Sequence, residues 1–366
     1  MPKWGMTMAT GKIVDWIATE GALVDEGDEL VEIETEKSVN VLETTSPGRL
    51  VRRVGQEGDE LPVGALLGVL APPGTEVSPE QIDEFVAEFN ASFVPEVPET
   101  EEVKGPSRVT VDGLVIAHRH HPGGGPPAAP PLVLIHGFGG DQDSWQFNVG
   151  EIARDRPVRT VDLPGHGQSS REVGDGSTQF LAGILSAWLD EVEPGPVHLA
   201  GHSLGAAVAL ELASAREVLS LTLIAGLGPG TAVDRDYVEG FITAQRRRQL
   251  KPHLLRLFAD ERFVTRDMVE TVLRAKRIES TSEALERIAR ASILATETEP
   301  RIRLASPPSP TQVIWGRRDQ VAPSAQAEAL SPPLTVEIIE GAGHMVHVET
   351  ASRVNRLLRR MATVHD

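Results

Sequence analysis

The chain contains no cysteine among its 366 residues. Disulfide bridges, thiolate nucleophiles and cysteine-ligated zinc are therefore excluded, and a cytoplasmic address fits this composition. No apolar run approaches the ~18 residues that a membrane-spanning helix requires. The longest run, around residues 204–212, is interrupted by Gly205 and Glu211. The first residues lack the apolar stretch of a secretory signal, so we expect neither secretion nor a membrane anchor.

Basic residues are missing from residues 76–102, which carry nine acidic side chains. Residues 1–75 are also acidic, with 13 Asp and Glu against 6 Lys and Arg, whereas the rest of the chain is nearly neutral, with 31 against 29. The negative charge of these two segments argues against binding to nucleic acid. The chain is long for one domain, so two domains joined by a linker are expected.

The first 75 residues contain an internal repeat with a spacing of 37 residues. Gly21 and Gly27 recur as Gly58 and Gly64, and apolar residues at strand positions recur at the same distance. Matching glycines at turns and matching apolar residues in strands indicate one small β unit that is used twice. Two such units would pack as a flattened two-sheet barrel, with Lys37 at the turn that joins them.

Lys37 lies in a polar turn between two strand-like alternations, residues 31–33 and 39–41. An exposed lysine at a turn is ordinary surface when it stands alone. Together with the repeat, however, the segment resembles a biotinyl/lipoyl carrier domain, in which a modified lysine lies on the hairpin between two quasi-twofold halves. Residues 34–38 (Glu-Thr-Glu-Lys-Ser) resemble the lipoyl version, although Glu36 stands where Asp is more usual, and no methionine flanks the lysine as in the biotin version. The resemblance implies covalent lipoate on Lys37.

Residues 76–106 form the acidic linker. Ser78 to Gln81 have the pattern of a capping box with proline at the first helical position. Apolar residues follow at helical spacing, which predicts a short amphipathic helix over about residues 79–90. We expect its apolar stripe to pack on one of the two domains, and the alternative is a docking helix for a partner subunit. The remainder of the linker, rich in Pro and Glu, should be extended.

From residue 107 onward strands and helices alternate, as in an α/β sheet. An apolar strand over residues 196–200 leads into residues 201–205 (Gly-His-Ser-Leu-Gly), and a helical pattern follows over residues 206–214. The glycines of this motif permit a strained turn that lifts the serine hydroxyl out of the sheet, against the start of a helix. Ser203 is therefore the candidate nucleophile.

A serine hydroxyl needs a base, and the base needs a carboxylate that orients it. The strand over residues 312–315 is followed by Asp319, and the strand over residues 335–339 is followed by His344. Asp162 is a rival carboxylate at another strand end, but it precedes the nucleophile. The chain order Ser, Asp, His favours Asp319.

These motifs resemble the α/β-hydrolase fold, over residues 107–366. The resemblance implies an oxyanion hole at the backbone N–H groups of Phe138 and Leu204, and a cap over the active site at about residues 230–300. Helical patterns in this insertion cover residues 234–249, 252–259, 266–278 and 282–295.

Several conspicuous residues favour ordinary structural roles. His118, His120 and His121 look like a metal cluster, but they lie on a strand and its exit, and we expect no metal. The basic run 246–248 with Lys251 is open to three interpretations: a contact with coenzyme A phosphates, a contact with the acidic carrier domain, or a solvated helix face.

The expected architecture is thus multi-domain: an all-β lipoyl-type flattened barrel (residues 1–75), a linker (76–106) and an α/β-hydrolase domain with a helical cap (107–366). This combination resembles the acyltransferase (E2) components of acetoin dehydrogenase complexes. It departs from ordinary E2 chains, because their His-x-x-x-Asp-Gly motif is missing. The resemblance implies acetyl transfer from lipoyl-Lys37 to coenzyme A, in a homo-oligomer that works with a thiamine-diphosphate-dependent E1 and an FAD-dependent E3.

Two alternatives stay open at this point. In the first, the Ser-His-Asp site is an esterase or thioesterase that releases the acyl group to water. In the second, the chain is a swinging-arm carrier and scaffold whose hydrolase domain is not essential.

Overall fold

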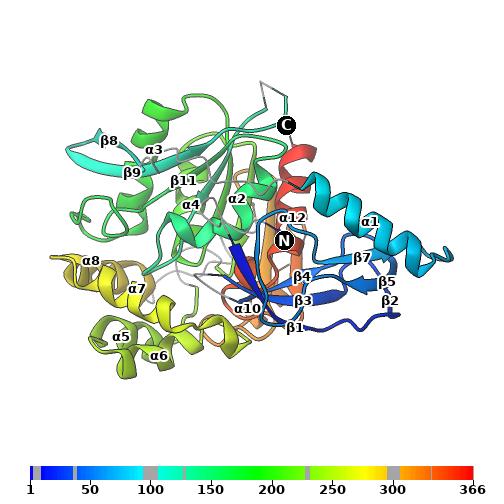
Figure 1. Cartoon of the computed structure of the whole chain (residues 1–366). Coiled ribbons are helices and arrows are strands. Elements are labelled where there is room, and N and C mark those ends of the chain that lie inside the picture. The colour runs from blue at the N-terminus through cyan, green and yellow to red at the C-terminus, as the bar shows by residue number, and fades with distance from the viewer. Residues whose placement is uncertain are drawn as a thin grey trace. The chain divides into compact units, whose positions relative to one another are not determined.

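The computed structural model divides the chain into two compact units, Met1–Val103 and Lys104–Asp366 (Figure 1). The residues that it describes are 1–2, 10–35, 39–93, 106–126, 129–226, 231–294, 306–330 and 332–365. None of the helices in these ranges is long and apolar enough to cross a membrane.

The first unit contains two antiparallel sheets. One has the strand order β4-β3-β1-β6 and the other the order β2-β5-β7. Their core contains Ile13, Val31, Ile33 and Leu50, which are almost fully buried. The strands are β1 (Thr10–Trp16), β2 (Leu23–Val24), β3 (Glu29–Glu34), β4 (Val39–Glu43), β5 (Gly48–Arg53), β6 (Glu60–Pro62) and β7 (Gly68–Ala71).

The 37-residue repeat appears in the pairing of the strands. β1 pairs with β3 and β5 pairs with β7, and each pairing has a register shift, after Ile13 in the first half and after Leu50 in the second. The halves also exchange short strands, since β6 pairs with β1 and β2 pairs with β5. Gly21 and Gly58 both have positive φ, at 88° and 92°, a region that favours glycine. The predicted quasi-twofold β unit is confirmed.

Strands β3 and β4 form an antiparallel hairpin in which Glu34 pairs with Val39. The four residues between them include Lys37, which lies outside the described residues together with Glu36 and Ser38. The described strands thus flank the segment that carries Lys37 on both sides.

The predicted linker helix is present as α1 (Pro79–Ser92). Ser78 and Gln81 form the capping box, and the proline occupies the first turn. Ile82 is buried, and Asp83 pairs with Arg52 of β5 at 2.9 Å. Phe93, just after the helix, packs against the core of the first unit. The apolar stripe is thus only partly covered: Phe89 stacks on Phe93 at a centroid distance of 5.9 Å, whereas Phe85 is 49% exposed.

The second unit is built on an eight-stranded sheet with the order β15-β14-β13-β12-β10-β11-β9-β8. The six strands β10 to β15 are parallel to one another. β9 and β8 are antiparallel and lie at one edge. The strands are β8 (Ser107–Val111), β9 (Leu114–His121), β10 (Leu132–Ile135), β11 (Val158–Val161), β12 (His198–His202), β13 (Ser220–Ile224), β14 (Thr311–Gly316) and β15 (Thr335–Ile339).

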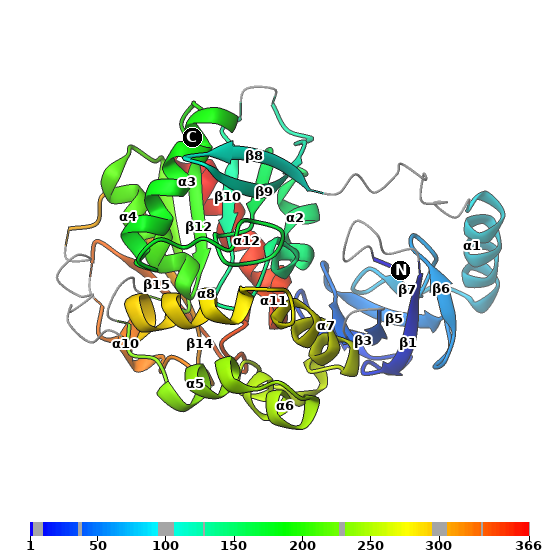
Figure 2. The ribbon, with the colours of Figure 1, turned by 90° about the vertical axis from the view of Figure 1, so that its left-hand side faces the viewer.

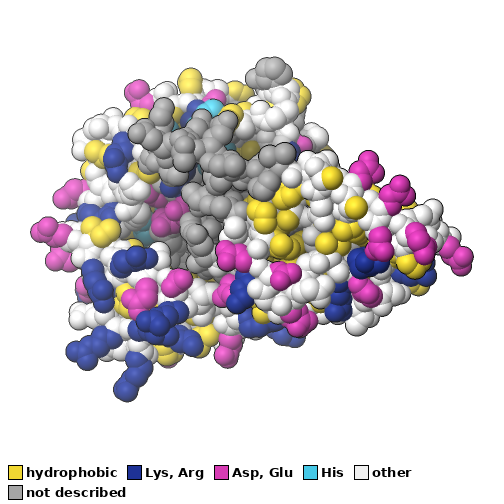
Figure 3. Space-filling model, in the orientation of Figure 1, with side chains coloured by type: hydrophobic (Ala, Val, Ile, Leu, Met, Phe, Trp, Pro, Cys, Tyr) yellow, Lys and Arg dark blue, Asp and Glu magenta, His cyan; other side chains and the backbone are white. Residues whose placement is uncertain are grey.

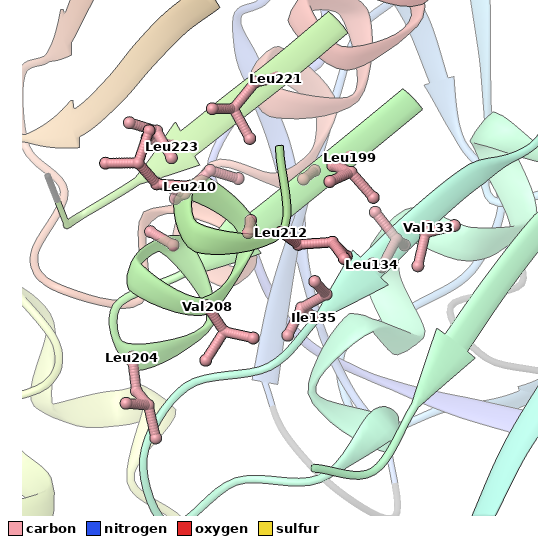
Figure 4. Close-up of a cluster of buried hydrophobic side chains, with 14 of the residues drawn as sticks. Val133, Leu134, Ile135, Leu199, Leu204, Val208, Leu210, Leu212, Leu221 and Leu223 are labelled. Atoms are coloured by element: carbon pink, nitrogen blue, oxygen red, sulfur yellow. The ribbon is translucent and has the colours of Figure 1, made fainter. Parts of the chain in front are cut away.

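Helices cover both faces of this sheet. α3 packs on α4 at one face, and α2 packs on α12 at the other (Figure 2). Aliphatic side chains of α4 such as Val208 and Leu212 lie among those of β10, β12 and β13 (Figure 4). The helices around the sheet are η1 (Gln142–Trp145), α2 (Gln146–Ile152), α3 (Thr178–Val192), α4 (Leu204–Ala215), α10 (Ala325–Glu328), α11 (Val346–Glu349) and α12 (Ala351–Val364).

A helical insertion between β13 and β14 has a small hydrophobic core of its own, which includes Val238, Leu250 and Leu254. We call this insertion the cap. Its elements are α5 (Arg235–Thr243), α6 (Arg247–Leu255), η2 (Glu261–Phe263), α7 (Arg266–Lys276), α8 (Thr281–Ile288) and the π-helical turn η3 (Ala289–Ile293).

The continuous helix predicted over residues 234–249 is wrong, because α5 ends at Thr243 and α6 begins at Arg247. Two contacts stabilise the break. Lys276 donates from Nζ to the carbonyls of Phe241, Ile242 and Ala244 at the end of α5. Gln249 accepts the N–H of Arg246 at 3.1 Å at the start of α6. These partners take the place of intrahelical hydrogen bonds.

Candidate active site

Ser203 lies at the sharp turn between β12 and α4. Its backbone has φ 53° and ψ −113°, a conformation that non-glycine residues seldom adopt. Its N–H donates to the carbonyl of Ile224 on the neighbouring strand at 2.8 Å. This is the strained strand-turn-helix geometry that the Gly-x-Ser-x-Gly motif predicts.

The two glycines of the motif are required by close backbone contacts. A Cβ atom on Gly201 would lie 2.1 Å from the carbonyl oxygen of Gly205. A Cβ atom on Gly205 would lie 2.3 Å from the carbonyl oxygen of Ile135, at the end of β10. No side chain fits at either position, so the motif allows α4 to begin directly against β10 and β12.

His344 and Asp319 form a buried pair on the loops after β15 and β14. Nδ1 of His344 lies 2.8 Å from Oδ2 of Asp319, and the two side chains are 3% and 0% exposed. Oδ1 of Asp319 accepts the N–H groups of Val321 and Ala322, both at 2.8 Å. The carboxylate is thereby fixed, and it can hold His344 with Nδ1 protonated and Nε2 free to act as a base.

The residue next to Ser203 connects it to His344. Nε2 of His202 lies 3.0 Å from the carbonyl oxygen of His344, and the two rings have centroids 4.9 Å apart. Within the described residues no hydrogen bond joins Oγ of Ser203 to the imidazole of His344. Such contacts often tighten only when a substrate is bound.

The loop after β10 lies against Ser203. A Cβ atom on Gly137 would lie 3.2 Å from Cβ of Ser203 and 2.7 Å from Nδ1 of His202. Among the described residues, the N–H groups of Phe138 and Leu204 have no backbone acceptor outside regular helices and strands. One of these donors lies on the loop that contacts Ser203 and the other directly follows Ser203 in the chain, and backbone N–H groups of this kind are suited to stabilise a negatively charged oxygen.

His136 shapes this loop. Its Nδ1 lies 2.8 Å from the carbonyl oxygen of Gly137, and its Nε2 accepts the N–H of Leu163 at 3.0 Å. The imidazole therefore bridges the loops after β10 and β11. Burial lowers the pKa of His136, and it lowers the pKa of His202 well below the ordinary value. Both side chains are neutral supports of the loops that they occupy.

Asp162, the rival carboxylate, is engaged elsewhere. It accepts the N–H of Gln142 at 2.8 Å, the side-chain amide of Gln142 at 3.0 Å and the N–H of Gln168 at 2.8 Å. These bonds fix the turn after β11. The structure thus brings Asp319, and not Asp162, to His344.

His118 and His121 are buried on β9, where burial lowers the pKa of each to about 4. Nowhere in the described part of the chain are three His, Asp or Glu side chains arranged to hold a metal ion. His118 packs against Trp188, with ring centroids 5.5 Å apart.

Two residues of the cap support the site without any local signal in the sequence. The ring of Phe241 lies 5.7 Å from that of Phe138, and a Cβ atom on Gly139 would lie 2.4 Å from it. Lys276 lies over Phe241, with Nζ 5.0 Å from the ring centroid. Only the folding of the cap onto the loop after β10 brings these residues together.

The basic run on the cap is exposed. Arg246, Arg247, Arg248 and Lys251 are all at the surface, and Lys and Arg side chains gather over this end of the second unit (Figure 3). Its three interpretations remain alternatives.

The fold and the arrangement of the site are those of the α/β hydrolases, here joined to a lipoyl-type β domain. A model of the "Alpha/beta hydrolase family" matches residues 132–357, and a "Biotin-requiring enzyme" model matches residues 1–70. Among solved structures, the second unit is similar to a bacterial membrane phospholipase A (TM-score 0.59, 25% identity, 71% of this chain and 86% of that one). It is also similar to a meta-cleavage product hydrolase (TM-score 0.63, 20% identity, 71% and 98%), which shows the shared fold.

Two relatives match nearly the whole chain. It is 39% identical to the dihydrolipoyllysine-residue acetyltransferase component of the acetoin cleaving system of Cupriavidus necator, over 98% of this chain and 96% of that protein. It is 38% identical to the component of the same name from Pseudomonas putida, over 100% of this chain and 98% of that protein. The chain belongs to this family of acetyltransferase components.

Proposed function

We propose that this chain transfers acetyl groups from a lipoyl thioester on Lys37 to coenzyme A through Ser203, as the acetyltransferase (E2) component of an acetoin cleaving system. The E2 identity follows from the family, whose members match both units over nearly their full length. The observation that supports the serine route is the His344–Asp319 pair, 2.8 Å apart, next to a strained serine.

The described residues fit a lipoyl group on Lys37. The pairing of Glu34 with Val39 leaves a four-residue connection at the end of an antiparallel hairpin, and this connection contains the lysine. Lipoate, when attached there, would supply a cyclic disulfide that opens on reductive acylation, so that one sulfur would carry the acyl group as a thioester and the other would become a thiol. The proposed carrier domain is residues 1–75, followed by the linker 76–106 and the catalytic domain 107–366.

In the first half of the proposed reaction, Oγ of Ser203 attacks the thioester carbonyl while Nε2 of His344 takes the hydroxyl proton. Asp319 holds Nδ1–H and stabilises the imidazolium that forms. The N–H groups of Phe138 and Leu204 stabilise the oxyanion. The carbon–sulfur bond then breaks, His344 returns the proton to the leaving sulfur, and an acetyl ester remains on Ser203.

In the second half, the thiol of coenzyme A occupies the place of the departed sulfur. His344 accepts its proton, and the sulfur attacks the acetyl ester. The carbon–oxygen bond breaks, His344 protonates Oγ, and Ser203 is restored together with acetyl-CoA. This is ping-pong chemistry, in which His344 activates first Ser203 and then the thiol of coenzyme A as the acceptor of the acetyl group.

The E2 component works within a multienzyme system. We propose that a thiamine-diphosphate-dependent E1 cleaves acetoin and supplies the acetyl group, that an FAD-dependent E3 reoxidises the dithiol, and that the chain is homo-oligomeric. A cytoplasmic location also remains a prediction.

The test is Ser203→Ala in the lipoylated full-length chain, with E1 and acetoin present and acetyl-CoA measured. We expect a loss of at least about a thousandfold, because the nucleophile is gone. Ser186→Ala, within α3, is the matched control and should leave the rate unchanged. Transfer by the Ser203 variant at the wild-type rate would exclude the serine route.

Release of the acyl group to water is the second candidate. It is favoured by the similarity of the second unit to a phospholipase structure at 25% identity. The acceptor decides between the two functions: with coenzyme A present, acetyl-CoA should form and free acetate should not. The carrier-and-scaffold alternative is tested by a fluorophosphonate probe, which should label Ser203 if the site is active.

A further inference from the structure

The loop that carries His344 is bound to the cap on both sides of the histidine. Immediately after it, the N–H of Met345 donates to the carbonyl oxygen of Leu257 at 2.9 Å. Immediately before it, Gly343 lies against the backbone of the cap: a Cβ atom there would be 2.7 Å from the nitrogen of Ala259. The candidate base is therefore held between two backbone contacts with residues 257–259.

Glu349 completes the second contact. Its Oε1 accepts the N–H of Gly343 at 2.7 Å, and its Oε2 accepts the N–H of Ala259 at 2.8 Å. The side chain is partly buried at the end of α11, five residues after His344. One carboxylate thus joins the histidine loop to the cap through two hydrogen bonds, each of which uses a different oxygen.

We infer that Glu349 is a positioning residue that couples the cap to His344, so that the base is correctly placed only while the cap segment 257–259 is seated. The inference rests on the proposed role of His344. Two charge-assisted hydrogen bonds to backbone donors hold a loop more firmly than neutral ones would. A displacement of the base by about 1 Å is enough to lower a rate about a hundredfold.

The contact depends on the ionised form of Glu349. A carboxylate offers acceptors at both oxygens, whereas a protonated carboxyl offers a donor at one of them. Burial raises the pKa of Glu349 to about 7, although the hydrogen bonds from Gly343 and Ala259 lower it. A hydrogen bond from the backbone of Asp260 on the cap also lowers this pKa, whereas the negative charge of the Asp260 side chain, which is paired with Arg262, raises it.

His347 lies on the same short helix as Glu349, and burial lowers its pKa to about 3, so it is neutral at working pH. The remaining titratable neighbour on the loop is His344. As the pH falls through 7, Glu349 takes up a proton and the two-oxygen contact is lost.

The experiment is Glu349→Gln in the full-length lipoylated chain. The amide keeps the volume and one acceptor oxygen, but it turns a donor toward one of the two N–H groups. Glu283→Gln, on the exposed face of α8, is the matched control. Turnover of p-nitrophenyl acetate gives kcat and KM, and fluorophosphonate labelling gives both the number of active serines and their rate of reaction.

We expect Glu349→Gln to lower kcat per labelled serine by about tenfold to a hundredfold, with KM changed less than twofold. Between pH 8 and 6, log kcat should fall more steeply in the wild type than in the variant, because only the wild type takes up a proton on residue 349 in this range. If kcat per labelled serine matches that of Glu283→Gln, or if only the number of labelled serines falls, the positioning role is excluded.

Ser203→Ala, measured in parallel, separates this inference from the proposed function. Turnover that survives in Ser203→Ala contradicts the serine route itself. Turnover that is lost in Ser203→Ala but normal in Glu349→Gln leaves the serine route intact and removes only the coupling through Glu349.

Discussion

Nε2 of His202 lies 3.0 Å from the carbonyl oxygen of His344, so the residue before the candidate nucleophile holds the backbone of the candidate base. Burial keeps His202 neutral, because its pKa lies well below the ordinary value. A carbonyl oxygen only accepts hydrogen bonds, so Nε2 carries the hydrogen of the neutral ring. β12 and the loop after β15 are joined at the point where the proposed chemistry takes place.

His202→Leu should weaken both stability and turnover. Without the imidazole, the buried carbonyl of His344 lacks this donor, which lowers the free energy of unfolding by about 1–3 kcal/mol. His202→Gln should retain more of both, because its side-chain amide can donate from a similar position. Urea unfolding and kcat for p-nitrophenyl acetate measure the two effects, and equal behaviour of the two variants would contradict the role of the hydrogen bond.

Gly201→Ala should destabilise the second unit by about 1–3 kcal/mol or more, because its Cβ would lie 2.1 Å from the carbonyl oxygen of Gly205. Labelling of Ser203 by a fluorophosphonate should also be lost.

Gly183→Ala is the matched control: this glycine is exposed in α3 with nothing within 4 Å of an added Cβ. It should stabilise the chain by about 0.5–1 kcal/mol, since alanine favours a helix. Equal unfolding midpoints for the two variants would count against the close contact.

Lys37→Arg should separate the two parts of the proposed reaction. The variant has no amine for lipoylation, so acetyl-CoA formation from acetoin should fall to background, while Ser203 should still turn over p-nitrophenyl acetate. Lys12→Arg, an exposed position on β1, is the control and should keep both activities. Intact mass reports the lipoylation. Undiminished acetyl-CoA formation by Lys37→Arg would place the acyl carrier elsewhere.

Acid should destabilise the second unit as the pH falls from 6.5 to about 4. Six buried histidines have lowered pKa values, chiefly because of burial, so they take up protons mainly on unfolding and the stability they contribute is lost as the pH falls below 6.5. They are His118, His121, His136, His166, His202 and His347.

Two carboxyl groups act in the opposite direction. Burial raises the pKa of Asp141 and of Glu349 to about 7, so both bind protons in the folded state below that pH. The histidines outnumber them, and the net effect is uptake of protons on unfolding. Each net proton contributes about 1.4 kcal/mol per pH unit. Thermal melts from pH 7.5 to 5 check the sign, and a melting temperature that rose on acidification would refute it.

Much of the architecture can be predicted from local patterns. The spacing of Gly21 and Gly58 predicts equivalent turns, since only glycine adopts their positive φ without strain. The capping residues Ser78 and Gln81 predict the start of α1. The glycines around Ser203 predict the strained turn, because the backbone contacts at these positions exclude a side chain.

Other features depend on residues that are distant in the chain. The break between α5 and α6 could not be predicted, because Lys276 accommodates it from another helix. The choice between Asp162 and Asp319 rests in the sequence on chain order alone. In the structure it follows from hydrogen bonds, since Gln142 and Gln168 engage Asp162 while Nδ1 of His344 lies 2.8 Å from Asp319.

The sequence by itself determined the two-unit organisation, the duplicated β domain around Lys37 and the candidate trio Ser203, Asp319 and His344, because each follows from spacing along the chain and from the side chains that local backbone geometry allows. Only the tertiary structure decided how the cap meets the candidate base. Glu349 joins Gly343 to Ala259, 84 residues apart, and a hydrogen bond between such positions exists only after the sheet and the cap have packed.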